Sequence, residues 1–350
     1  MSVPPRRGWR EAALLVASLL VTAGALEAAA RLLWRPDVAL RRPPPPEWRD
    51  LPVVTGLFEM ARANVRGLVG GALYETNSAG FRGPERALPK PRGVFRIAVI
   101  GDSFAMGSGV TQEETYADRL ERALAAAHPE RRIEVLNFGL GGLAAPAVVD
   151  RLVRLGLRYD PDLIVYGYTL NDIEGPAYRR SIEATFVDPL HFARHPLHLW
   201  RVLGPRFASL RELLFAPHGS YSHELDENYF HNPEAWRAVQ DALDRLAGIA
   251  RRRGSCALVL VHTHLVWLSP LHPFRRHYQA VVRAAEERGL AAIESFPAHR
   301  GESASSLWVG AIDSHPNARG HEILFEVLEE GLARLPASCW EGRRRAPRSS

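Results

Sequence analysis

Residues 97–104 have the sequence Ile97-Ala98-Val99-Ile100-Gly101-Asp102-Ser103-Phe104. The run is apolar and β-branched and then breaks at a glycine, which predicts a buried strand that turns into a helix. Thr111 and Glu114 have the spacing of a capping box and predict that a helix begins soon after the turn. A serine at such a turn lies at the carboxyl edge of a sheet and near a helix amino end, where ligands and negative charge bind. Because Gly-Asp-Ser is also common turn chemistry, other segments must decide whether Ser103 is reactive.

From about residue 94 onward the chain alternates expected strands with expected helices. The strands are predicted at 96–101, 133–138, 162–168, 256–262 and 290–295, and the helices at 114–128, 145–158, 234–253, 274–288 and 317–334. Short links between alternating elements are typical of a parallel sheet covered on both faces and joined by right-handed crossovers. We therefore expect an α/β fold, a three-layer α/β/α sandwich.

The chain divides into four expected parts. They are an N-terminal membrane anchor or signal segment at 1–35, a Pro-rich spacer and irregular lead-in at 36–92, the folded domain at 93–338, and a basic tail at 339–350. Within the domain, residues 173–233 are too long for a simple connection and are rich in Leu, Phe and Trp. We expect this insertion to be either a lid or membrane-facing flap over the site, or a packed accessory element.

The N-terminal segment is long and apolar enough to cross a membrane. Residues 12–34 are 23 residues, which at about 1.5 Å each can span a ~30 Å hydrocarbon layer. Trp9 and Trp34 would lie at the two interfaces, whereas Glu27 and Arg31 interrupt the apolar pattern. A cleaved signal peptide ending near residue 25 and a soluble amphipathic helix are the alternatives. If the segment is an anchor or a signal peptide, the folded domain lies outside the cytoplasm, either on the periplasmic or cell-surface side or secreted. Because arginines flank the span on both sides, the charge distribution is a weak guide to the orientation of the span in the membrane.

Charge and cysteine content limit the partners. The 350 residues have a net charge of +5, but the first ten and the last ten each carry +3, so the remaining 330 sum to −1. A nucleic-acid-binding domain carries positive charge on a folded face, so we expect no nucleic-acid partner. Cys256 and Cys339 could pair in an oxidising compartment, but a core of this size does not need a disulfide, so two unpaired thiols are expected.

Four segments place reactive residues where strands end or helices begin. They are Gly101-Asp102-Ser103, the glycine-rich run 136–142, the run 167–172 with Asn171, and the run 313–317 with Asp313 and His315. A serine becomes a nucleophile when a histidine takes its proton, and a carboxylate fixes the tautomer of that histidine. Backbone N–H groups and an amide side chain can then stabilise the oxyanion, each contributing on the order of 3 kcal/mol. The set therefore predicts acyl transfer.

These four blocks resemble the SGNH/GDSL hydrolase family, in its order, over roughly residues 94–335. The resemblance implies no cofactor and an acylated small-molecule, glycan or lipid substrate, and we expect a flavodoxin-like sheet and no metal. It implies Ser103 as nucleophile, His315 as base and Asp313 as orienting carboxylate. It also implies an oxyanion hole made by Ser103, Gly142 and Asn171, with Gly139 as an alternative to Gly142.

The chain departs from the family pattern in two places and matches it in one more. One residue separates Asp313 from His315, where the family usually has two, and Gly141-Gly142 replaces the more frequent Ser-Gly. The run 77–83 (Asn-Ser-Ala-Gly-Phe-Arg-Gly) resembles a segment that precedes the catalytic domain in membrane-tethered bacterial members.

Several alternatives stay open on the sequence alone. Asp102 and Asp172 are expected to fix turns rather than react. His262 and His264 alternate near a strand end, so they either line or pack the pocket or begin a zinc site that still lacks a third ligand. The predicted function is an esterase acting on short-chain O-acyl esters, such as acetyl esters, through an acyl-enzyme. The alternatives are an O-acetyltransferase for an envelope glycan, a lysophospholipase or lipid esterase, a metal-assisted hydrolase and a non-catalytic binding module.

Overall fold

The computed structural model describes residues 7–33, 45–54, 57–174, 196–200, 203, 207, 221–310 and 313–341. The chain forms two compact units, one made of residues 1–37 and 187–217 and the other of 38–186 and 218–350. The first unit contains α1 (Arg7–Leu33). Its segment Trp9–Leu32 has a mean hydropathy of 1.9 and is uncovered by protein, so its length and composition suit either a membrane span or a signal sequence. Trp34, predicted at an interface, lies outside the described residues.

The second unit is built on a five-stranded parallel sheet. Its strands are β3 (Phe95–Gly101), β4 (Ile133–Asn137), β5 (Leu163–Tyr168), β6 (Cys256–Val261) and β7 (Ala291–Glu294). Their order is β4-β3-β5-β6-β7, and every neighbouring pair is parallel. This is the flavodoxin-like order, so the predicted fold class is confirmed.

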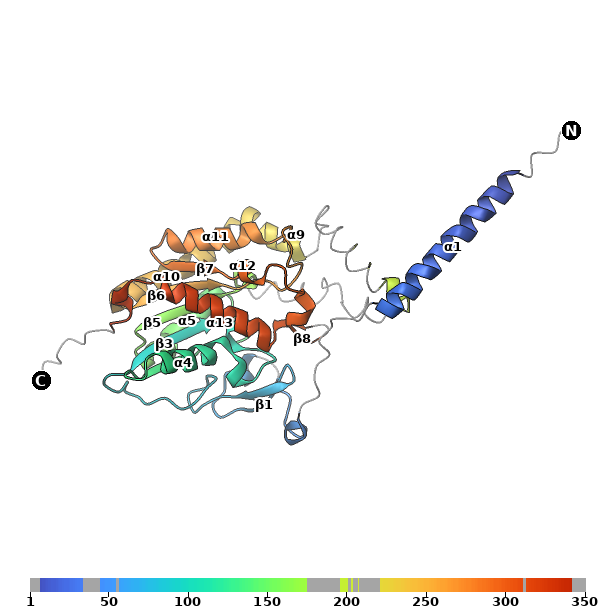
Figure 1. The fold of residues 1–350 in the computed structure, drawn as a ribbon. Coiled ribbons are helices and arrows are strands. Elements are labelled where there is room, and N and C mark those ends of the chain that lie inside the picture. Colours follow the sequence, from blue (N-terminus) through green and yellow to red (C-terminus); the bar gives the residue numbers. More distant parts are fainter. Residues whose placement is uncertain are drawn as a thin grey trace, which may run out of the picture. The chain divides into compact units, whose positions relative to one another are not determined.

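Helices cover both faces of the sheet, which gives three layers (Figure 1). One face carries α4 (Tyr116–Ala127) and α13 (Ala318–Ala333), and the other α5 (Ala145–Arg154), α10 (Pro233–Arg253) and α11 (Arg275–Glu286). Successive strand residues alternate between the two cores: Ile97 and Val99 pack toward α4 and α13, and Ala98 and Ile100 toward α5 and α10. A strand buried on both faces is apolar at every position, which is why the sequence revealed it.

Shorter elements complete the described part of the chain. They are α2 (Leu57–Met60), β1 (Arg66–Val69), β2 (Ala72–Glu75), α3 (Ser103–Met106), α9 (Tyr221–Asp226), α12 (Phe296–His299), β8 (Trp308–Gly310), β9 (Asp313–Pro316), a π-helical turn at Glu227–His231, and 3-10 turns at Pro46–Trp48, Gln112–Glu114, Gly156–Tyr159, Leu170–Ile173, Ala304–Leu307 and Ala337–Cys339. The predicted capping box of Thr111 and Glu114 is present. It closes the 3-10 turn at Gln112–Glu114, however, and Thr115 caps α4 instead.

The expectation of an irregular lead-in is wrong for part of residues 36–92. β1 and β2 form an antiparallel hairpin, with Val69 opposite Ala72. The intervening Gly70 and Gly71 both have positive φ angles, 60° and 83°, which a tight two-residue hairpin turn requires and glycine adopts without strain. Tyr74 and Val54 are buried in one cluster with Met106 and Leu140 of the sheet-containing unit, so the lead-in is part of that folded unit.

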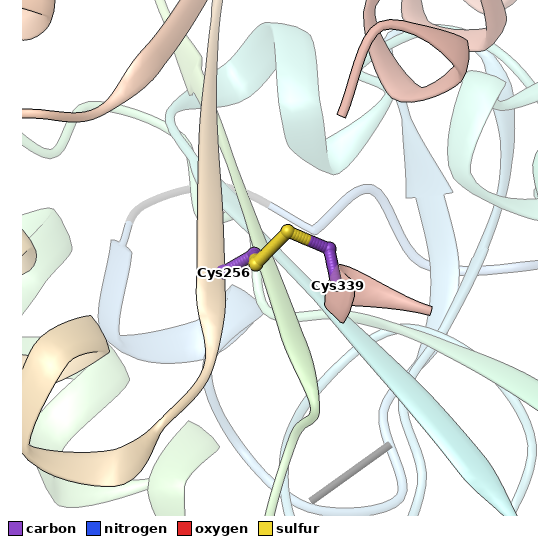
Figure 2. The surroundings of a disulfide bond; sticks show 2 residues. All are labelled: Cys256 and Cys339. Atoms are coloured by element: carbon purple, nitrogen blue, oxygen red, sulfur yellow. A yellow bond between two sulfur atoms is a disulfide. The ribbon is translucent and has the colours of Figure 1, made fainter. Parts of the chain in front are cut away.

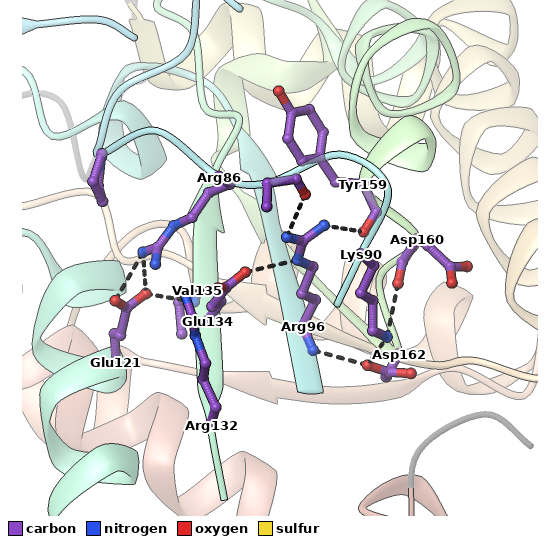
Figure 3. A network of polar contacts seen from close by, with 12 residues as sticks. Arg86, Lys90, Arg96, Glu121, Arg132, Glu134, Val135, Tyr159, Asp160 and Asp162 are labelled. Carbon is purple, nitrogen blue, oxygen red and sulfur yellow. Dashed lines mark hydrogen bonds and ion pairs between the residues drawn. The ribbon is translucent and has the colours of Figure 1, made fainter. Parts of the chain in front are cut away.

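A buried ion network joins the lead-in to the amino ends of the strands (Figure 3). The fully buried Arg96 donates from Nε to Glu134 at 2.8 Å, and its remaining guanidinium nitrogens donate to the carbonyls of Ala87 and Tyr159. Asp162 accepts from the Arg96 backbone N–H at 2.8 Å and pairs with Lys90. Charged groups buried in this way are stable because every one is paired, and they fix the edge of the sheet opposite to the strand carboxyl ends.

The prediction of two unpaired thiols is wrong. Cys256, at the start of β6, forms a disulfide with Cys339, and their Cα atoms are 5.5 Å apart (Figure 2). Cys339 is buried in the 3-10 turn Ala337–Cys339, so the folded domain extends past the tail boundary expected at residue 339. The two cysteines are 83 residues apart in sequence, and the packing of the C-terminal turn beside the first residue of β6 brings them together.

Removing the disulfide is expected to lower the free energy of unfolding without abolishing activity. Because the bond closes an 83-residue loop, the chain entropy that it removes from the unfolded state corresponds to about 4.5 kcal/mol. Urea unfolding of the Cys256→Ala, Cys339→Ala double variant measures this difference, and reduction of the wild type should give the same change. If a reducing agent shifts the wild-type urea midpoint no more than it shifts that of the double variant, the bond contributes nothing.

Candidate active site

The turn after β3 is held in place by a close approach to β5 and by Asp102. A Cβ atom on Gly101 would lie 2.4 Å from the Gly167 carbonyl oxygen, so only glycine fits between the strands. Asp102 caps α3 by accepting the Phe104 N–H at 3.0 Å, and the same carboxylate oxygen accepts from the Thr169 hydroxyl at 3.0 Å. Ser103 is thereby fixed as the first residue of α3.

Three side chains that are far apart in sequence meet at this turn. His315 Nε2 lies 2.8 Å from Ser103 Oγ, and His315 Nδ1 lies 2.5 Å from Asp313 Oδ1. All three residues are only partly buried, so they can be reached from solvent. Nucleophile, base and orienting carboxylate require this arrangement of hydrogen bonds.

The unusual spacing of Asp313 and His315 has a structural explanation. Both lie in β9, which pairs antiparallel with β8. Side chains two residues apart in a strand point to the same face, so one intervening residue is enough to bring the carboxylate beside the imidazole. The Asp313 carboxylate also accepts the backbone N–H of His315 at 3.2 Å, which orients it further.

The glycine-rich run after β4 lies against α3. A Cβ atom on Gly141 would lie 3.6 Å from the Cβ of Ser103, which places the Gly141-Gly142 pair next to the serine. The N–H of Gly139 instead donates to Asn137 Oδ1 at 3.0 Å. Because that donor is engaged, Gly139 is a poorer oxyanion donor than Gly142, which remains the predicted one.

Asn171 lies in the 3-10 turn Leu170–Ile173 that follows β5, and it is partly exposed. Its side chain is within hydrogen-bonding reach of the Asp102 carboxylate, so its amide lies beside the residue that precedes Ser103. Burial raises the pKa of Asp102 above its ordinary value, although the Phe104 N–H and the Thr169 hydroxyl oppose this shift. The oxyanion roles of Gly142 and Asn171 stay predictions.

Asp172 is fully buried rather than a simple surface turn residue. It accepts a hydrogen bond from the Tyr166 hydroxyl at 2.7 Å. Burial raises its pKa well above the ordinary value, and the charge of Asp102 adds to the shift. Asp172 therefore ties the turn after β5 to the strand itself, which supports the expected structural role.

His262 and His264 do not share a site. His262 Nδ1 lies 3.2 Å from the Thr169 hydroxyl and its ring stacks on Phe104, whereas the ring of His264 stacks on Tyr221. Burial lowers the pKa of each histidine to about 3, so both are neutral. In the described ranges, no group of three or more His, Cys, Asp or Glu side chains is arranged to hold a metal ion.

Two residues that support the site were not predicted from the sequence. Thr169 links the Asp102 carboxylate to His262, and Arg82 is buried with its guanidinium on the loop after α3. Arg82 donates to the carbonyls of Met106 at 2.9 Å, Gly107 at 2.6 Å, Val110 at 2.6 Å and Leu73 at 3.1 Å. An arginine within the apolar and glycine-rich run 77–83 was the available signal, since a buried guanidinium needs several acceptors.

The profile of the GDSL-like lipase/acylhydrolase family matches residues 99–323, which is more than half of the chain. The chain belongs to this family. The resemblance stated from the four sequence blocks is thus confirmed, and the protein is an ester-hydrolysing enzyme.

Several solved structures are similar to this GDSL-like chain. TesA is 19% identical and the match covers 68% of this chain and 97% of TesA, with a TM-score of 0.41. A variant of Axe2, an acetylxylan esterase from Geobacillus stearothermophilus, is 16% identical over 72% and 97% of the two chains, with a TM-score of 0.43. LAE5, an alpha/beta hydrolase from the metagenome of Lake Arreo, Spain, is 17% identical over 69% and 97%, with a TM-score of 0.44. No curated protein matches the chain.

Proposed function

We propose that this enzyme hydrolyses O-acyl esters through a covalent acyl-enzyme on Ser103. The single observation that carries the proposal is the continuous chain of hydrogen bonds from Ser103 Oγ to His315 Nε2 at 2.8 Å and from His315 Nδ1 to Asp313 Oδ1 at 2.5 Å. Membership of an acylhydrolase family supports the same chemistry.

The proposed reaction has two halves. His315 Nε2 takes the proton of Ser103 Oγ as the oxygen attacks the ester carbonyl, and then gives that proton to the departing alcohol. A water molecule, deprotonated by the same nitrogen, then attacks the acyl-serine, and His315 returns this proton to Ser103 Oγ as the bond to the acyl group breaks and the acid is released. In both halves Asp313 stabilises the imidazolium, and the N–H groups of Ser103 and Gly142 with the Asn171 amide stabilise the oxyanion.

We further propose a short acyl group and a substrate in the cell envelope. The glycine-rich rim beside Ser103 favours a small acyl group, such as acetyl, on a glycan or a lipid. The Cys256–Cys339 disulfide is typical of an oxidising compartment, and α1 supplies a tether to the membrane. The hydrolase domain would then face the extracytoplasmic side.

A panel of p-nitrophenyl esters from acetate to palmitate tests this proposal. We expect the highest kcat/KM on the shortest chains and a decrease of at least about 10³-fold in Ser103→Ala. A fluorophosphonate probe should label the wild type but not this variant. Ser108→Ala, which removes a partly buried hydroxyl in the next loop, is the matched control and should keep both activity and labelling.

Three results would count against parts of the proposal. Full activity in Ser103→Ala would show that the reaction does not pass through an acyl-enzyme on Ser103. A preference for long chains would favour a lipid esterase. Transfer of the acyl group to an added glycan in place of water would make the enzyme an O-acetyltransferase.

A further inference from the structure

We propose that the side chains of Leu197, Trp200, Leu203 and Phe207 form an apolar ridge that inserts into the headgroup region of the bilayer crossed by α1, and that Glu27 holds this ridge against the end of α1. The inference rests on the proposed membrane tether and adds a second contact with lipid. It concerns only the unit made of residues 1–37 and 187–217.

Glu27 joins the two parts of this unit. Its carboxylate accepts the backbone N–H of His198 at 2.8 Å and that of Leu199 at 2.7 Å, and it pairs with Arg31 at 2.8 Å. Arg31 in turn donates to the Pro196 carbonyl at 3.3 Å. A carboxylate in an apolar helix is costly in lipid unless it is paired, and here four hydrogen bonds pair both charged groups. The two residues that interrupt the apolar pattern of α1 are thus the ones that bind the insertion.

The segment held by Glu27 exposes large apolar side chains. Leu197, Trp200, Leu203 and Phe207 are 52%, 39%, 36% and 56% exposed. Trp200, Leu203 and Phe207 are helical and have the i, i+3, i+7 spacing of one helix face, and the rings of Trp200 and Phe207 stack 6.1 Å apart. Four such side chains within eleven residues form a ridge that water solvates poorly.

The depth of the contact identifies lipid as the partner. Glu27 lies five residues before the end of the apolar segment Trp9–Leu32, or about 7 Å at 1.5 Å per residue. Amphipathic helices that lie in a membrane surface bury their apolar face by a similar depth, about 5 to 10 Å. A ridge attached at Glu27 therefore lies where headgroups meet acyl chains if α1 spans the bilayer.

The sequence of the segment has the charge that such a surface attracts. Residues 187–217 contain four arginines (194, 201, 206 and 211) against Asp188 and Glu212, a balance of +2. Anionic headgroups attract basic segments near the membrane, and tryptophan favours the same interface. The charge and the aromatic content of the segment thus favour the same location as the position of Glu27 does, the surface of the bilayer.

Tryptophan quenching in vesicles tests the ridge. The full chain is reconstituted in phosphatidylcholine and phosphatidylglycerol vesicles, with lipids brominated near the carbonyl end of their chains as quenchers. The signal of Trp200 is the wild-type emission minus that of Trp200→Phe, and Trp9→Phe and Trp236→Phe give the signals of α1 and of the hydrolase body. We expect the Trp200 signal to fall about twofold on bromination, and the Trp236 signal to stay unchanged.

The Trp9 signal distinguishes a failure of the ridge from a failure of the proposed membrane tether. Quenching of Trp9 without quenching of Trp200 overturns the ridge but leaves the tether. Absence of quenching at both sites overturns the tether and the ridge together. Esterase activity of the same preparation reports on Ser103 chemistry independently of both.

Replacing Glu27 tests the clamp. Glu27→Leu keeps α1 apolar but removes the acceptor of the His198 and Leu199 N–H groups, so the Trp200 signal should lose about half of its quenching while that of Trp9 is retained. Glu11→Leu, which removes an exposed acid near the other end of α1, is the matched control and should change neither signal. Unchanged Trp200 quenching in Glu27→Leu would overturn the role of Glu27.

Discussion

Replacing His315 with alanine is expected to lower kcat/KM for p-nitrophenyl acetate by a factor on the order of 10⁴. The reason is that the Ser103 hydroxyl then loses Nε2, the base that lies 2.8 Å away, and is left with the longer hydrogen bond to Asp102 Oδ2 at 3.4 Å. Steady-state kinetics on the purified variant measures the loss. Because the ring of His315 is partly exposed, the substitution should leave the unfolding midpoint close to that of the wild type.

A surface histidine provides the matched control. His128 follows α4, half of its side chain is exposed, and its Nδ1 lies 3.5 Å from Glu130 Oε1. His128→Ala should therefore keep kcat/KM within about twofold of the wild type, in line with the small effects of surface substitutions. If His315→Ala were as active as His128→Ala, the proposed base would be wrong.

The companion variant Asp313→Asn tests the orienting carboxylate. An amide cannot stabilise the imidazolium and can favour the wrong tautomer, so kcat should fall by about 10² to 10⁴. Asp102, the residue before Ser103, is a competing acid, but its carboxylate accepts from Phe104 and Thr169 and caps α3. If Asp313→Asn kept the wild-type rate, Asp313 would not be the carboxylate that orients His315.

The parallel sheet was predictable because its chemistry is local. A strand buried on both faces is apolar throughout, and helices of ten or more residues between such strands leave few other topologies. The four reactive blocks were predictable for the same reason, since each lies next to an end of one of these elements. β8 and β9 were not, because a run such as Asp313-Ser314-His315-Pro316 has no strand periodicity and acquires its conformation from pairing.

Contacts between residues that are far apart in the chain could not be predicted from the sequence. Whether Cys256 pairs with Cys339, 83 positions later, depends on where the turn at residues 337–339 packs, and the intervening sequence does not indicate it. The hairpin in the lead-in was accessible, because Gly70-Gly71 between apolar residues is a turn signal that the expectation of irregular structure overlooked. Arg82 lay between these cases: its residue type marked it as unusual, but only the structure gives its acceptors.

Arg82→Met is expected to lower the free energy of unfolding by about 3 to 5 kcal/mol. The fully buried guanidinium satisfies four backbone carbonyls, three of them in residues 106–110, and methionine would leave them without donors. Burial lowers the pKa of Arg82 to about 10, so the side chain is charged at neutral pH and its hydrogen bonds are charge-assisted. Urea unfolding measures the change.

The same substitution is expected to lower kcat more than it raises KM. The loop that Arg82 holds follows α3, which begins with Ser103, and it also touches β8, since a Cβ on Gly109 would lie 2.7 Å from Val309. β8 pairs with the strand that carries His315, so the loop braces the serine against the histidine. A displacement of about 1 Å between nucleophile and base costs on the order of 10²-fold in rate. A merely structural arginine would instead lower Tm while the folded fraction kept its kcat.

Two further variants test whether these effects are specific to the guanidinium of Arg82. Arg66→Met removes an arginine from the neighbouring hairpin, where an exposed pair with Glu75 is its contact, and should cost less than about 1 kcal/mol with no change in kcat. Arg82→Lys retains the charge but concentrates three donors on one nitrogen, which cannot reach carbonyls on both sides of the loop, so it should recover only part of the stability and of kcat. Full recovery in Arg82→Lys would mean that the positive charge, rather than the planar set of donors, holds the loop between Ser103 and His315.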